Sequence, residues 1–214
     1  MSVLIDNSDL FVEGLRGTVS LTVAAALLAI ALGTALAACL VSPVPSLRGP
    51  AAFFVNVMQN LPLTLLFFLI VFGLPRVQVR GLSYWQLAVL TLGLYTSAFI
   101  CEVLRSGINT VAAGQAEAAR SLGMNFSQNL RLVILPQAVR SVVGPIGSTL
   151  IALTKNTSVA TAFSVTELTG VASDLNEEGA AVAGLFGVAI CYLVLILFMS
   201  YGFERLERKV AFAR

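Results

Sequence analysis

The chain has 214 residues, of which 57% are hydrophobic and only 11% are charged, whereas about a quarter of the residues in a soluble globular domain are charged. This composition excludes an ordinary soluble domain and indicates a protein of the lipid bilayer. The absence of histidine excludes His-ligated metal sites and Ser–His hydrolytic dyads, and the three widely separated cysteines indicate neither a disulfide framework nor a metal cluster.

A phosphate-binding loop requires a lysine followed by serine or threonine after a glycine-rich turn. The two lysines, Lys155 and Lys209, are instead followed by Asn156 and Val210. We therefore expect that the chain is not an enzyme, that it has no ATP site of its own and that it holds no cofactor or metal.

Five segments with few or no charged residues are long enough to cross a bilayer, for which a helix needs about 20 residues. They are residues 17–47, 49–75, 81–101, 141–166 and 179–203, and the fourth is interrupted by Lys155. The sequence predicts an all-α membrane protein with five transmembrane helices, in which residues 1–214 form a single transmembrane domain.

An odd number of crossings places the two termini on opposite sides of the membrane, and arginine and lysine concentrate on the cytoplasmic side. With the N-terminus outside and the C-terminus inside, nine basic residues lie inside: Arg48, Arg105, Arg120, Arg131, Arg140, Arg205, Arg208, Lys209 and Arg214. The outer half then keeps Arg16, Arg76, Arg80 and Lys155, together with most of the acidic residues, including Glu167, Asp174, Glu177 and Glu178. We predict this orientation.

The first helix, about residues 15–40, carries Gly33 and Ala37 at a spacing that lets a neighbouring helix approach closely. The second helix begins near residue 51, and its first half contains Gln59, Asn60 and Pro62. Polar side chains at this depth either satisfy neighbouring backbone groups or line a cavity. Both readings remain open from composition alone.

The third helix ends near Arg105, and Glu102 lies three residues before it, on the same helical face. This spacing predicts a structural ion pair near the inner membrane surface.

Residues 106–140 are polar enough to leave the membrane and predict a cytoplasmic helical hairpin. Its two short helices are expected at residues 115–122, ended by Gly123 in a left-handed conformation, and at residues 127–135, ended by Pro136. An apolar stripe recurs every fourth residue along it: Leu122, Phe126, Leu130 and Ile134. The stripe must be buried against the membrane helices or against a partner protein.

The fourth crossing contains five consecutive polar residues, 154–158, around Lys155. An ionisable group at membrane depth marks a substrate or ion path by default, although the lysine can also extend to the outer surface. A short outer amphipathic helix is predicted at residues 165–175, before the last crossing and a basic tail.

The predicted hairpin resembles the EAA loop of binding-protein-dependent ABC importer permeases. The resemblance rests on the Glu-Ala-Ala triplet at residues 117–119, on Gly123 and on the Ile-Leu-Pro sequence at residues 134–136. Residues 95–108 and 153–158 are similar to the polar amino-acid branch of that family. The combination of residues 106–110 with residues 114–120 is similar to actinobacterial glutamate importers. The similarity covers nearly the whole chain.

The resemblance implies a permease subunit that imports a polar amino acid, most specifically glutamate. It also implies one transmembrane permease domain, with its coupling loop at about residues 106–140. Transport is then driven by ATP hydrolysis on a partner ABC ATPase dimer, which carries the ATP and Mg. The residues implied to contact the ATPase are Glu117, Ala118, Ala119 and Gly123. Further implied partners are a second permease subunit, either a paralogue or another copy, and a substrate-binding protein outside the bacterial plasma membrane. No nucleic acid is implied.

The residues expected to bind the substrate are Lys155, Asn156, Thr157, Ser158, Gln59 and Asn60. At the start of the second helix the family usually has Arg-Gly-Thr-Pro or Arg-Asn-Thr-Pro, whereas this chain has Gln-Asn-Leu-Pro at residues 59–62. Lys155 is then the remaining deep cation that can meet the carboxylates of an acidic amino acid. The alternative function is a nucleotide-independent channel or ion-coupled carrier, which leaves the apolar stripe of the hairpin unexplained.

Overall fold

The computed structural model describes residues 6–79, 81–177 and 179–210, and it contains helices and no strand within these ranges. Arg80, Glu178 and Arg214, which entered the predicted charge distribution, lie outside the described residues. The helices in chain order are α2 (Ser8–Val41), α3 (Pro45–Asn60), α4 (Leu63–Phe68), the π-helical η1 (Leu69–Gly73), α5 (Leu74–Arg76), α6 (Tyr84–Asn109), α7 (Ala113–Ser121), α8 (Phe126–Asn129), the π-helical η2 (Leu130–Ile134), α9 (Leu135–Asn156), the 3₁₀-helical η3 (Thr157–Phe163), α10 (Leu168–Glu177) and α11 (Ala181–Val210).

Four helical runs are long and apolar enough to cross a membrane: Ser8–Val41, Tyr84–Asn109, Phe126–Phe163 and Ala181–Val210. The remaining predicted crossing, the second along the chain, consists of Pro45–Asn60 and Leu63–Arg76, which meet at a bend of 110°. Leu61 and Pro62 have extended backbone there, with ψ of 135° and 132°. Proline disfavours a helical conformation in the residue before it, so the bend follows from Pro62. The predicted all-α membrane fold is confirmed.

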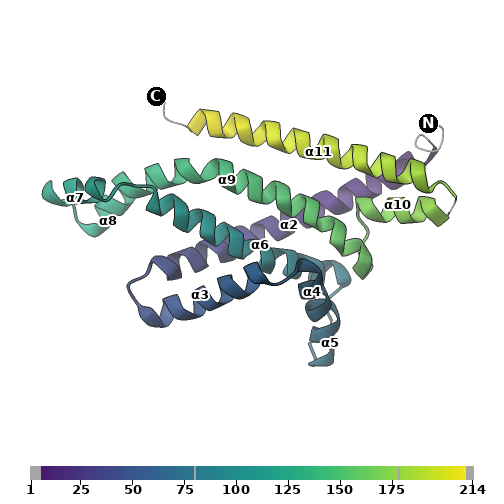
Figure 1. Ribbon diagram of the computed structural model, residues 1–214, viewed down its shortest axis with the longest axis horizontal. Helices are drawn as coiled ribbons and strands as arrows, with labels where there is room; N and C mark the ends of the chain where they lie inside the picture. Colours follow the sequence, from purple (N-terminus) through teal and green to yellow (C-terminus); the bar gives the residue numbers. More distant parts are fainter. Residues whose placement is uncertain (1–5, 80, 178, 211–214) are drawn as a thin grey trace.

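The long helices α2, α6, α9 and α11 run along the longest axis of the molecule (Figure 1). Helices α7 and α8 lie at one end of this axis, together with the C-terminal end of α11, and we call it the hairpin end. Helix α10 and the beginning of α2 lie at the other, which we call the α10 end (Figure 1).

Helices α2 and α6 pack against each other more extensively than any other pair, and small residues allow their approach. A Cβ atom at Gly33 would lie 2.8 Å from the Ile100 side chain and from the Ser97 carbonyl oxygen, so a larger residue has no room there. Ala37 is buried in the same interface against Ala98. The close packing predicted at residues 33 and 37 is therefore present.

The core near the middle of the molecule joins the two interrupted crossings. Phe67 of α4 stacks on Phe163 of η3 with ring centroids 4.9 Å apart, and Leu92 of α6 and Leu153 of α9 complete the same cluster. Stacked aromatic rings of this kind stabilise a contact beyond the area that they bury. The bend of one crossing thus rests on the 3₁₀ segment of the other.

Two predicted boundaries are wrong for instructive reasons. Pro136 does not end the second hairpin helix, because α8, η2 and α9 form one continuous helical run. In η2 the Leu135 N–H donates to the Leu130 carbonyl, five residues back, and this wider turn accommodates the proline ring that would clash in an α-helix. The second helix begins at Pro45 rather than near residue 51, since proline fits the first turn of a helix.

Other boundaries differ by a few residues. The third helix continues past Arg105 to Asn109, and the amphipathic helix at the α10 end spans residues 168–177 rather than 165–175. The predicted interruption near Lys155 is a change from α-helix to 3₁₀-helix at residue 157, with no unwound segment.

Candidate functional site

A groove with a volume of about 400 Å³ lies between the middle of α6 and the C-terminal half of α9. It is lined by Tyr95, Thr96, Phe99, Ser148, Thr149, Ala152, Leu153 and Asn156. Two aromatic rings lie on its α6 side, with the centroids of Tyr95 and Phe99 5.1 Å apart, and the α9 side combines hydroxyl and amide groups with apolar side chains. Apolar walls with a few placed polar groups are typical of small-molecule sites.

The structure places the predicted substrate residues of the fourth crossing on different sides of the helix. Asn156 lines the groove, while Lys155 is exposed and forms no ion pair within the described residues. Ser158 is partly buried and donates to the Lys155 carbonyl at 2.8 Å. Thr157 is completely buried and donates to the Thr154 carbonyl at 2.8 Å. These residues therefore do not form one cluster.

The predicted residues of the second crossing are engaged with backbone. The Gln59 Nε2 donates to the Ala98 carbonyl at 3.4 Å, which ties α3 to α6, and the Asn60 Nδ2 donates to the Asn56 carbonyl at 2.7 Å. Asn60 is exposed at the bend before Pro62. Two readings were left open for these polar residues, a cavity lining or hydrogen bonding to backbone. In the structure, Gln59 and Asn60 both hydrogen-bond to backbone.

A second hollow of about 440 Å³ opens toward the hairpin end of α6, between α2, α3 and α6. The Arg105 Nη2 lies 2.7 Å from the Glu102 Oε2, and Arg48 lines the same hollow. Because both side chains of the pair are between a third and a half exposed, at 46% and 34%, the pair contributes at most about 1 kcal/mol to stability.

The coupling residues predicted from the EAA pattern lie on α7 and the turn after it. Gly123 has φ of +80°, a left-handed conformation that favours glycine, and the Met124 N–H donates to the Ala119 carbonyl at 3.1 Å. Glu117 and Ala118 are exposed, whereas Ala119 is buried and packs within the hairpin.

The apolar stripe of the hairpin divides into a covered and an uncovered half. Leu130 and Ile134 are partly buried, whereas Leu122 and Phe126 each expose 82% of their surface. The Asn129 Nδ2 donates to the Ala116 carbonyl at 3.1 Å and holds the two halves of the hairpin together. The hairpin is therefore a braced unit that presents two large apolar side chains outward.

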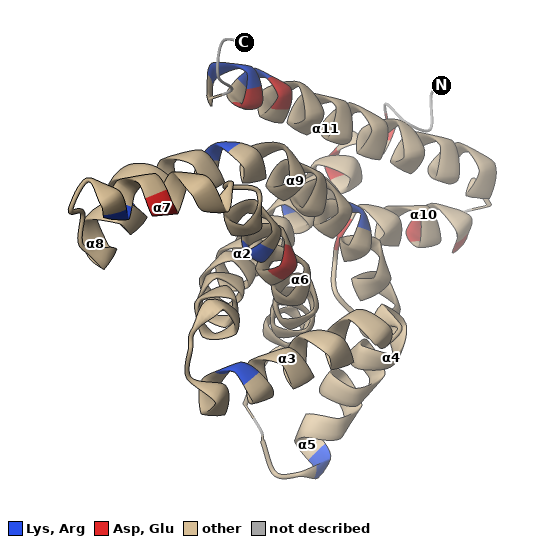
Figure 2. Ribbon diagram, turned by 60° about the vertical axis from the view of Figure 1, so that its left-hand side comes forward, with Lys and Arg blue, Asp and Glu red and all other residues tan. Residues whose placement is uncertain are grey.

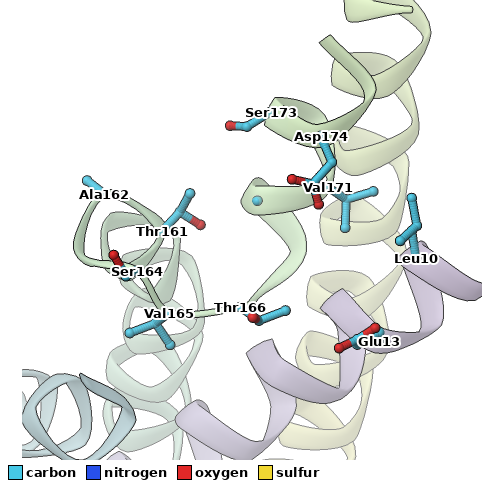
Figure 3. A pocket seen from close by; sticks show the side chains of 11 residues that line it. Leu10, Glu13, Thr161, Ala162, Ser164, Val165, Thr166, Val171, Ser173 and Asp174 are labelled. Carbon is cyan, nitrogen blue, oxygen red and sulfur yellow. The ribbon is translucent and has the colours of Figure 1, made fainter. Parts of the chain in front are cut away.

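A third hollow, of about 650 Å³, lies at the α10 end between α2, η3 and α10. Figure 3 shows Thr161 and Ser164 on one side of it, and Glu13 and Asp174 on the other. The lining combines acidic, hydroxyl and aliphatic residues, in contrast to the aromatic groove between α6 and α9.

Sequence reasoning missed Glu167, which it assigned only to the acidic residues of the outer half. Its side chain is completely buried just before α10, where its Oε1 accepts hydrogen bonds from the Thr161 hydroxyl and, at 2.8 Å, from the Thr169 N–H. The one signal in the sequence is a glutamate directly before a helix, with Thr166 before it and Thr169 two residues after it, a position where a carboxylate can cap the helix.

Comparison with known proteins agrees with this geometry. A sequence model of the family described as "Binding-protein-dependent transport system inner membrane component" matches residues 22–212. The chain is 44% identical over 211 residues to a glutamate transport system permease protein of Corynebacterium efficiens, with 91% of each chain covered. It is 35% identical to a probable glutamine ABC transporter permease protein of Bacillus subtilis, and the aligned part covers 98% of this chain and 97% of that protein.

A solved crystal structure of an amino acid ABC transporter with histidines contains a chain that superimposes with a TM-score of 0.92 at 27% identity, covering 97% of each chain. A subunit of a methionine ABC transporter captured in inward-facing conformations has the same fold, with a TM-score of 0.82 at 21% identity and coverage of 97% of this chain and 99% of that one.

Proposed function

The chain belongs to the family of binding-protein-dependent transport system inner membrane components, and on that premise we propose that it forms half of the membrane pathway of an ABC importer for glutamate. It is a multi-pass membrane protein. The proposed cycle needs an ATPase dimer, a second permease subunit and a substrate-binding protein that delivers the amino acid.

The observation that carries the proposal is the exposure of Leu122 and Phe126 on a braced hairpin. Two large apolar side chains that are each 82% exposed beside exposed polar residues such as Glu117 are typical of a surface that a partner covers. In the proposed assembly this surface docks on the ATPase, with Glu117, Ala118 and Gly123 in or beside the contact and Ala119 supporting it from within.

The arrangement of charges supports a cytoplasmic position for the hairpin end. Figure 2 shows basic and acidic residues side by side on α7 and at the C-terminal end of α11, whereas the charged residues of α10 are acidic. From residue 113 to 140 the chain has Arg120, Arg131 and Arg140 against Glu117, so basic residues are in excess at the hairpin end. Excess arginine and lysine mark the cytoplasmic side of a membrane protein. We therefore place the C-terminus inside, and the α10 end outside, where the binding protein delivers its cargo.

The helical run from the hairpin to the groove supplies a route for coupling. Residues 126–163 are continuously helical, so a displacement of the hairpin is carried along α9 to Asn156 beside the groove. The π-helical turn at residues 130–134 lies at the foot of this run, and such turns are frequent at functional sites. In this mechanism the ATPase moves the hairpin, and α9 opens or closes the groove.

The groove supports a polar amino acid as cargo. Its hydroxyl groups and the Asn156 amide can hydrogen-bond the amino and carboxylate groups. We assign the side-chain carboxylate of glutamate to Lys155, the exposed cation that precedes Asn156 in the chain. Exposed polar side chains at this depth must face protein or water rather than lipid. We propose that the second permease subunit covers the groove and its exposed polar side chains, so that each chain contributes half of the pathway.

Uptake of labelled glutamate into proteoliposomes tests the proposal. The vesicles hold this chain with its partner permease and ATPase, and the binding protein is added outside. We expect uptake that requires ATP, is lost in Lys155→Ala with the complex still assembled, and is retained in a Lys209→Ala control. Uptake that proceeds without ATP would favour the channel or carrier instead, and transport of glutamine or arginine in place of glutamate would contradict the cargo.

A further inference from the structure

The buried carboxylate of Glu167 joins helices that are distant in the sequence. While its Oε1 is bound by η3 and α10, its Oε2 accepts hydrogen bonds from the Tyr192 hydroxyl of α11 at 2.6 Å and from the Thr18 hydroxyl of α2 at 3.3 Å. The Thr18 oxygen in turn accepts the Leu168 N–H at 3.1 Å. Segments from four parts of the chain thus meet at one side chain.

A buried carboxylate is costly unless its oxygens are hydrogen-bonded. Glu167 has four donors and forms no ion pair within the described residues, so neutral hydroxyl and amide groups alone compensate its burial. Because each donor comes from a separate position, the carboxylate specifies how η3, α10, α2 and α11 sit against one another. A hydrophobic side chain of similar size cannot give this specification.

One of these donors leads back to the groove between α6 and α9. The Tyr192 hydroxyl lies 3.4 Å from the Thr157 Oγ1, and the Thr157 hydroxyl donates to the Thr154 carbonyl at 2.8 Å. Thr157 is the first residue of η3 and directly follows Asn156, which lines the groove. A row of hydroxyl contacts therefore runs from Glu167 through Tyr192 to the junction of α9 and η3.

We propose that Glu167 is a positioning residue for Asn156. Acting through Tyr192 and Thr157, it holds the junction of α9 and η3 so that the Asn156 amide faces the groove. The role in transport rests on the proposed function, because it takes the groove as the cargo path. The positioning itself does not depend on which molecule is carried.

Thr18 provides a matched control, since Thr18 and Tyr192 donate to the same oxygen from different helices and only Tyr192 continues to the junction. In reconstituted complexes with saturating loaded binding protein, we expect Tyr192→Phe and Glu167→Gln to lower the ratio of glutamate to glutamine uptake by about fivefold, the factor for one lost hydrogen bond. Thr18→Val should leave this ratio unchanged, even if it lowers the thermal stability as much as Tyr192→Phe does. Equal ratios in all variants, or an equal fall in Thr18→Val, would overturn the proposal.

A second measurement is independent of cargo. Asn156→Cys is introduced into the assembled complex after the three native cysteines are replaced by alanine, and the rate of labelling with a water-soluble maleimide is followed. Adding Tyr192→Phe should speed the labelling several-fold, while adding Thr18→Val should not. Unchanged labelling with Tyr192→Phe and Glu167→Gln would refute the positioning role. A clear change in a complex that carries no amino acid would instead leave this role intact and refute only the proposed function.

Discussion

At the hairpin end, Leu122 and Phe126 expose 82% of their surface, whereas at the α10 end the carboxylate of Glu167 is completely buried. Each end reverses the usual rule that apolar groups are inside and charged groups outside. The two ends differ in whether the chain itself supplies a partner for these unusually placed side chains. The hairpin side chains have no cover within the described chain, while Glu167 is satisfied by four internal donors. The hairpin end is thus shaped for a partner, and the α10 end is held together by the chain itself.

The largest effect is expected where the internal network is removed. Glu167→Ala removes the acceptor of four donors, one on the buried Thr18 and three on partly buried residues, and should lower the free energy of unfolding by about 3 kcal/mol or more. The purified protein in detergent should lose its monodisperse form at a much lower temperature. A variant as stable as the parent would show that the network does not hold the α10 end together.

At the hairpin end the effect should fall on assembly rather than on stability. Phe126→Ala removes an exposed side chain, so the fold should be unchanged within about 0.5 kcal/mol, while affinity for the ATPase falls by about 2 kcal/mol, or roughly thirtyfold. Co-purification and titration with the ATPase measure the second quantity.

Phe198→Ala is the matched control for this experiment, since Phe198 on α11 is 77% exposed but lies away from the hairpin. Equal loss of ATPase binding in both variants would remove the hairpin from its proposed role.

A smaller effect is expected at the turn that shapes the hairpin. Gly123→Ala forces a side chain into φ of +80° and should destabilise the hairpin by about 1 kcal/mol. Gly114→Ala is the control, because Gly114 lies within α7 with open space around it. The maximal transport rate should fall with the first change alone, and a parallel fall with both would point to a general sensitivity of α7.

The smallest effect is expected for an exposed carboxylate. Glu102→Gln breaks the ion pair with Arg105, but solvent screens both groups, so the free energy of unfolding should change by less than about 1 kcal/mol. Thermal unfolding of this variant beside Glu167→Ala compares an exposed carboxylate with a buried one directly. A loss as large as that of Glu167→Ala would contradict the distinction between the two ends.

Features that depend on local rules were predictable from the sequence. The long apolar segments indicated the crossings, and Gly123 indicated the left-handed turn after α7. The prediction that Pro136 ends a helix was wrong because a wider π-helical turn precedes it. The hydrogen bonds of that turn do not follow from a residue pattern.

The burial of Glu167 was not predictable, since its donors come from residues as far away as Thr18 and Tyr192. Thr157 was assigned to the substrate together with Asn156, because spacing alone did not show that the two side chains point to different sides of the helix. The burial of Glu167 and of Thr157 depends on tertiary contacts, which the local sequence does not specify.

The most direct test of the account is the labelling rate of Asn156→Cys in the assembled complex, in a background without native cysteines, with and without ATP. If the hairpin transmits ATPase motion along residues 126–163 to the groove, labelling should change when ATP binds, and Phe126→Ala should abolish that change. Identical labelling with and without ATP, in a complex shown to hydrolyse ATP, would contradict the coupling of the hairpin to the groove.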